Sequence, residues 1–189
     1  IRMAELDGVL CSGDLLPMKM TYCLSAEKMG PRTFRDPDES LHDIAKRYFQ
    51  SHAPATIEDF VWWSGLTKSE CKKGMASLGD QLISIRHADT NFYLLDSYRT
   101  QGILRNNLIL LPSYDEYLIG YKSRYLVLDK KYTHLAHTRN GIFFPVVLHN
   151  GIAVGNWKPF EETLETKFFE PSSISAEKAW LQYQKYLNS

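Results

Sequence analysis

The sequence has no excess of charge of either sign. Its 22 lysine and arginine residues are balanced by 22 aspartate and glutamate residues. A protein that binds nucleic acid over its whole surface carries a broad positive field, which this composition excludes. Any contact with DNA must therefore be confined to one part of the surface.

Other features are also missing. Cysteines are few and show no CxxC spacing, which argues against a disulfide framework and a zinc cluster. His134 and His137 have helical spacing but lack further ligands at a matching interval. Neither a P-loop nor a glycine-rich nucleotide fingerprint occurs, and no apolar run approaches the ~18 residues of a membrane span. We expect a cytoplasmic protein without cofactor, metal ion or membrane contact.

What the sequence does contain is a short internal similarity. Residues 3–24 and residues 75–95 each show a helix end near a glycine, a short strand, a polar loop and a returning strand. The second copy is preceded by two helical patterns, whereas the first copy is not. We interpret residues 1–30 as the tail of a module whose front is absent; the alternative is chance similarity of short stretches.

The second copy can be built completely from its signals. A helix is predicted from about Asp38 to His52, after a proline-bounded linker at residues 31–40. Capping boxes at Thr56 and Thr67 open two further helices, and a hairpin with its tip at residues 88–91 follows. This order is the winged helix-turn-helix layout, and it predicts that the third helix enters the major groove of DNA.

The candidate DNA contacts lie on the outer side of that third helix, opposite its core-facing apolar positions. Small and cationic side chains there allow the backbone to approach base edges and neutralise phosphates. A basic stretch at residues 122–139 is a second candidate. In both places the alternative is ordinary solvated surface charge. The predicted contacts are Ser69, Lys72, Lys73, Ala76, Lys122 and Arg124.

The remaining sequence predicts a sheet with a closing helix. Leu108–Leu111 reads as a buried strand ended by a proline, and Asp115 as a helix cap with a carboxylate pairing to Arg124. Asn150-Gly151 marks a hairpin, and a third strand is expected at 164–169. The closing helix, at about 175–187, is predicted to bury one stripe of side chains. These are Ala179, Trp180, Tyr183 and Leu187.

The predicted fold class is therefore α+β, a tandem winged helix-turn-helix with its first unit truncated, followed by a small antiparallel sheet and a helix. The domains expected are residues 1–30 (tail of a winged helix), 31–40 (linker), 41–96 (complete winged helix) and 97–189 (α+β region with β-meander and closing helix).

Residues 48–66, YFQSHAPATIEDFVWWSGL, resemble the signature of the winged-helix DNA-binding family that includes the AlkZ-like (YcaQ-like) bacterial DNA glycosylases. Residues 4–13, 110–124 and 150–157 strengthen the resemblance, in the order that the family has them. The resemblance implies a protein of about twice this length that grips double-stranded DNA, including alkylated or crosslinked DNA, for repair.

The family's catalytic Gln-x-Gln or Gln-x-Asp motif lies near the N-terminus, and no such match occurs there. The one Gln-x-Gln spacing, Gln182 to Gln184, falls in the last predicted helix, so we assign no catalytic residue. Two functions stay open: the DNA-holding portion of a base-excising enzyme, itself inactive, or a non-enzymatic winged-helix DNA-binding protein or transcriptional regulator.

Overall fold

The computed structural model describes residues 1–31, 34–99, 106–161 and 163–187, so residues 32 and 33 of the predicted linker lie outside the described residues. The chain divides into two compact units, Ile1–Ser40 and Leu41–Ser189. The structure is a mixed α+β fold with small antiparallel sheets, as the sequence predicted. Among the described residues, no helix combines the length and apolar character needed to cross a membrane.

The first unit contains a short helix and a hairpin. Helix α1 (Arg2–Leu6) leads into β1 (Leu10–Ser12), which pairs antiparallel with β2 (Tyr22–Leu24). The predicted helix, strand, loop and returning strand are thus confirmed as local structure. A short helix that the sequence did not predict, α2 (Ser25–Met29), follows directly.

The second unit begins with helices that pack around one core. Helix α3 (Pro37–Ser51) starts where the Asp36 carboxylate accepts hydrogen bonds from the backbone N–H groups of Asp38 and Glu39, and proline suits this first position. Helices α4 (Ile57–Ser64) and α5 (Lys68–Ser77) both begin with the predicted capping boxes. Gly65 ends α4 in the left-handed conformation, with φ of 69°.

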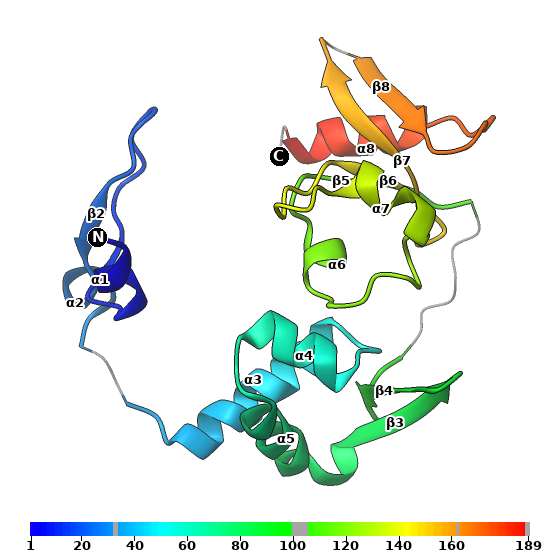
Figure 1. Ribbon diagram of the computed structural model, residues 1–189. Coiled ribbons are helices and arrows are strands. Elements are labelled where there is room, and N and C mark those ends of the chain that lie inside the picture. Colours follow the sequence, from blue (N-terminus) through cyan, green and yellow to red (C-terminus); the bar gives the residue numbers. More distant parts are fainter. Residues whose placement is uncertain (32–33, 100–105, 162, 188–189) are drawn as a thin grey trace. The chain divides into compact units, whose positions relative to one another are not determined.

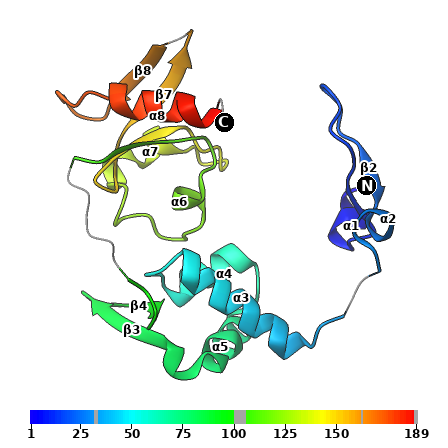
Figure 2. The same ribbon diagram turned by 180° about the vertical axis from the view of Figure 1, so that it is seen from behind.

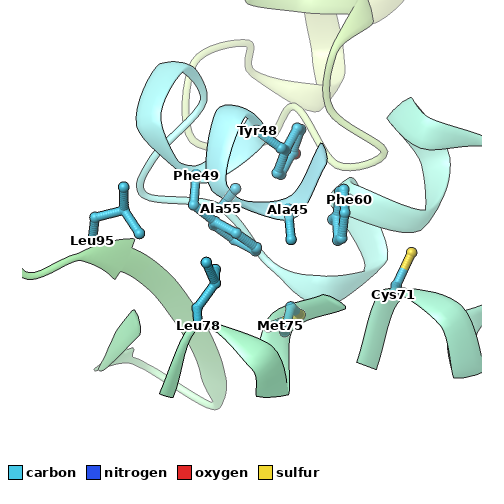
Figure 3. Packing of buried hydrophobic residues seen from close by; sticks show 9 residues of the cluster. All are labelled: Ala45, Tyr48, Phe49, Ala55, Phe60, Cys71, Met75, Leu78 and Leu95. Carbon is cyan, nitrogen blue, oxygen red and sulfur yellow. The ribbon is translucent and has the colours of Figure 1, made fainter. Parts of the chain in front are cut away.

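A hairpin follows the helices through the short 3-10 helix η1 (Gly79–Gln81). Strands β3 (Leu82–His87) and β4 (Thr90–Leu95) pair antiparallel, so the turn is Ala88–Asp89, shorter than the predicted tip. Ala55, between α3 and α4, adds a bridge to Tyr93 of β4 that the sequence did not reveal. Figure 3 shows how side chains from the helices and β4 meet in the core. Its buried members are Ala45, Tyr48, Phe49, Ala55, Phe60, Cys71, Met75, Leu78 and Leu95.

The rest of the unit is an antiparallel sheet in the order β5-β6-β7-β8. Its strands are β5 (Leu108–Leu111), β6 (Val146–His149), β7 (Ile152–Phe160) and β8 (Thr163–Phe168). The predicted Asn150-Gly151 turn joins β6 to β7, which confirms the hairpin. Pro145 precedes β6, so the ladder starts later than the apolar run from residue 142 suggested.

Alternate residues of these strands face two small cores. Leu110 and Val147 pack with Trp180 of α8 (Glu177–Leu187), and Figures 1 and 2 show this helix along the sheet. Leu111 and Val146 pack with the segment that contains α6 (Glu116–Ile119), η2 (Lys130–Tyr132) and α7 (Thr133–Ala136).

The predicted buried stripe of α8 is confirmed for Ala179 and Trp180, and Tyr183 packs against the same core. The prediction was wrong for Leu187, which is 60% exposed. Helical spacing places Leu187 on the side of Trp180 and Tyr183, but it is the last residue of the helix and does not join the side chains that pack in this core.

Candidate nucleic-acid interface

Helix α5 is fixed by its start and by its inner side. Thr67 accepts a hydrogen bond from the backbone N–H of Glu70, and the Glu70 carboxylate accepts one from the backbone N–H of Thr67 at 2.8 Å. On the inner side Cys71 and Met75 are buried, and Gly74 lies so close to α3 that an added Cβ would be 2.6 Å from the Leu41 carbonyl oxygen. This close packing fixes which side of α5 remains exposed.

That exposed side contains the four predicted contacts Ser69, Lys72, Lys73 and Ala76. Within the described residues, Lys72 takes part in no ion pair. The only acid in α5 is Glu70, whose carboxylate turns back onto Thr67. Apart from Glu70, which is exposed but bonded to Thr67, α5 contributes only cationic and small side chains to this face.

Lys68, at the start of α5, is held differently. Its Nζ lies 2.7 Å from Oε1 of Glu58, and this hydrogen bond is the main reason why the pKa of Glu58 is lowered. The positive charge of Lys122 lowers the same pKa to a smaller degree. Lys122, distant in sequence, is therefore within electrostatic range of the α4 carboxylate that also binds the start of α5.

The β3–β4 hairpin adds a cation that the sequence analysis missed. The Arg86 guanidinium lies 3.5 Å from the carboxylate of Asp89, and both side chains are largely exposed. Arg86 lies in β3, just before the turn, so its position beside the predicted tip could have identified it as a candidate DNA contact from the sequence. The pair leaves the tip with little net charge.

A buried carboxylate joins α4 to the segment that carries Lys122. Asp59, only 3% exposed, accepts hydrogen bonds from the backbone and hydroxyl groups of Thr56 in the capping box. Its other oxygen accepts from the backbone N–H groups of Lys122 at 2.9 Å and Ser123 at 3.3 Å. One side chain thus caps a helix and positions the backbone of a candidate DNA contact.

Neighbouring contacts reinforce this connection. The indole N–H of Trp62 donates to the Ile119 carbonyl at 3.0 Å, and the Tyr121 hydroxyl donates to the His52 carbonyl at 3.0 Å. Burial is the main cause that raises the pKa of Tyr121 to about 12. These bonds hold α6 and the residue that follows Gly120 against α4 and the end of α3.

Arg124 lies inside this connection, whereas the side chain of Lys122 is exposed. The Arg124 guanidinium is 5.9 Å from the Trp62 ring centroid and 5.0 Å from that of Phe143, and it donates to the Leu118 carbonyl. Its half-buried position lowers its pKa. Cation–π packing on two rings thus fixes the orientation of the guanidinium.

The predicted pairing of Arg124 with a neighbouring carboxylate was wrong. Asp115 instead caps α6, as predicted, by accepting from the backbone N–H of Tyr117 at 2.9 Å. Glu116 lies 3.4 Å from Nε2 of His52. The two adjacent carboxylates therefore serve separate contacts, as their alternating directions predicted.

The other basic residues are dispersed. Lys131, on the sheet side of the unit, pairs with Glu170 at 2.7 Å, and this bond is the main reason why its pKa is raised. Within the residues that the structure describes, no group of three or more histidine, cysteine or acidic side chains is arranged to hold a metal ion. Contact of the six predicted residues with DNA stays a prediction.

Comparisons with known proteins show the family of the chain. A search of curated proteins found no significant match. Among solved structures, Streptomyces sahachiroi DNA glycosylase AlkZ is similar, with a TM-score of 0.76 and 26% identity over 91% of this chain. The chain spans about half of that protein, 49% of its length. The sequence profile "DNA glycosylase AlkZ-like" matches residues 2–181, and the chain therefore belongs to the AlkZ-like DNA glycosylase family.

Proposed function

We propose that this chain is the DNA-holding portion of a bacterial, cytoplasmic AlkZ-like repair glycosylase. Residues 41–96 act as a complete winged helix, with α5 in the major groove and the β3–β4 hairpin as its wing. Residues 1–30 are the end of a preceding winged helix, 31–40 a linker and 97–189 an α+β end-piece. The partner is double-stranded DNA, including alkylated or crosslinked duplexes.

The observation that carries the proposal is the outer face of α5. Lys72 and Lys73 lie there beside the small side chains of Ser69 and Ala76, while the single acid of the helix is used in its cap. In a chain of balanced charge, such a face is a local region where phosphates meet little repulsion. The small side chains leave room for base edges.

We assign base excision to residues outside these 189. The Gln182-x-Gln184 spacing lies on α8, where the intervening Tyr183 stacks on Trp180 with ring centroids 5.8 Å apart. Tyr183 also meets Trp157 of the sheet at 4.9 Å. This packing indicates a structural role for the Gln182–Gln184 segment rather than a catalytic one. We therefore expect the chain by itself to release no base from alkylated DNA.

The test is a charge reversal on α5. Lys72→Glu combined with Lys73→Glu is expected to weaken duplex binding, and the slope of log affinity against log salt should fall by about 2, at roughly 0.9 for each phosphate that is no longer neutralised. Lys178→Glu combined with Lys185→Glu on the exposed side of α8 produces the same change of net charge and serves as the control. Equal losses of affinity in both variants would show only a general effect of charge and would refute the assignment of α5.

A further inference from the structure

The loop between β1 and β2 presents large apolar side chains to solvent. Leu15 and Met18 are fully exposed, with values of 100% and 103%, and Met20 is 81% exposed. Leu16 is half-exposed at 52%, and Pro17 lies between it and Met18. Figure 1 shows this loop projecting beyond the two strands, on the side away from α1 and α2.

The projecting loop is held in place by its own hydrogen bonds. At its base the backbone N–H of Gly13 donates to the Thr21 carbonyl at 2.9 Å, and the Thr21 hydroxyl donates to the carbonyl of Asp14. At its tip the backbone N–H of Lys19 donates to the Leu16 carbonyl at 3.3 Å. The apolar side chains are thus displayed on an ordered turn.

The second hairpin shows that an apolar tip is not a general property of hairpins in this chain. The β3–β4 turn consists of Ala88 and Asp89, and its acid pairs with Arg86. That tip is short and polar, as is usual for an exposed turn. The tip of the first hairpin, residues 15–20, therefore needs a different explanation.

We propose that residues 15–20 form a wedge that inserts between base pairs of the bound duplex. Leucine, methionine and proline are the side chains that DNA-bending proteins use to open a base step from the minor groove. Lys19 in the tip supplies a cation for the adjacent phosphates, and the Lys28 ammonium is held at the root by the Ser12 carbonyl at 2.6 Å. The proposal rests on the proposed DNA-holding function and adds duplex distortion to it.

Insertion as a wedge explains why exposed apolar side chains, an ordered turn and a lysine occur together in residues 15–20. Apolar side chains gain by leaving water, and the stacked bases on either side of an opened step offer apolar surface. An ordered loop loses little conformational freedom on insertion. The cost of unstacking is met at the same place by the phosphate contact of Lys19.

The test uses the full-length protein and a duplex that contains 2-aminopurine, whose fluorescence rises when its base is unstacked. The wedge variant combines Leu15→Ser, Met18→Asn and Met20→Ser, with asparagine chosen because Met18 has a positive φ of 59°. Wild type should raise the fluorescence on binding. The variant should lose that rise and about tenfold in affinity with an unchanged salt slope, because the substitutions remove apolar side chains and leave every cation in place.

Two further variants distinguish base-step insertion from the phosphate contact and from a general loss of exposed apolar surface. Lys19→Ala should reduce the salt slope by about 1 and keep most of the fluorescence rise. Leu181→Ser with Leu187→Ser removes apolar side chains of α8 that are 53% and 60% exposed, and it should leave both signals unchanged.

The wedge is refuted if the triple variant binds with full fluorescence rise, or if it lowers the melting temperature without DNA, which would show that the tip packs within the full-length protein. In either case, continued sensitivity of binding to Lys72→Glu with Lys73→Glu would leave the proposed function intact. Absence of duplex binding by the wild type would refute both proposals.

Discussion

Replacing Asp59 by alanine tests the connection between α4 and the segment that carries Lys122. The substitution removes the acceptor of the capping box, worth about 1 kcal/mol, and leaves the N–H groups of Lys122 and Ser123 without their partner. Each unsatisfied, partly buried N–H costs about 1 kcal/mol, the low end of the usual range. The free energy of unfolding should therefore fall by about 3 kcal/mol.

Urea unfolding followed by circular dichroism measures this loss of stability as a shift of the midpoint at constant slope. Glu70→Ala is the matched control, since Glu70 occupies the same capping-box position in α5 but is exposed and has no second partner segment. Its loss of stability should be clearly smaller, and amide hydrogen exchange at Lys122 and Ser123 should accelerate only in Asp59→Ala. Equal losses in the two variants would refute the role given to Asp59.

Three other substitutions have expected outcomes. Gly74→Ala should destabilise by about 1 to 3 kcal/mol in thermal unfolding, although alanine favours helices, because the added Cβ meets the Leu41 carbonyl oxygen at 2.6 Å; a more stable variant would contradict this. Tyr121→Phe should lower the free energy of unfolding by about 1 kcal/mol, because it loses the bond to the His52 carbonyl, and should remove the tyrosine whose pKa is raised to about 12. Tyr114→Phe, at an exposed position, is the control and should leave the free energy of unfolding unchanged. Lys68→Ala should raise the Glu58 pKa toward 4.5 in an NMR titration. Since a lowered carboxyl pKa stabilises the fold above its unfolded value, the difference from wild type should fade as the pH falls through the lowered pKa, and an unchanged pKa would exclude the ion pair.

Local signals were sufficient for most of the secondary structure. The capping boxes at Thr56 and Thr67 are formed by residues three positions apart, so the sequence shows both partners together. The Asn150-Gly151 turn and the cap at Asp115 are local in the same sense. Each could therefore be placed without knowledge of the tertiary structure.

Contacts between distant segments could not be read in this way. The capping box that begins at Thr56 was predicted, but the bonds of its Asp59 to Lys122 and Ser123 depend on how the second half of the unit packs on α4. Arg124 was expected near a carboxylate, whereas tertiary packing places it on the rings of Trp62 and Phe143. For the candidate interface, periodicity predicted the exposed face of α5, while the proximity of Lys122 to Glu58 appears only in three dimensions.

The central claim, that α5 and Lys122 face the DNA, is tested most directly by the reactivity of individual lysines. Acetylation of the full-length protein with and without duplex DNA, read out by mass spectrometry, compares each side chain in both states. We expect Lys72, Lys73 and Lys122 to lose reactivity on binding, while Lys178 and Lys185 on α8 keep it. Protection of the α8 lysines with unchanged reactivity on α5 would contradict the account.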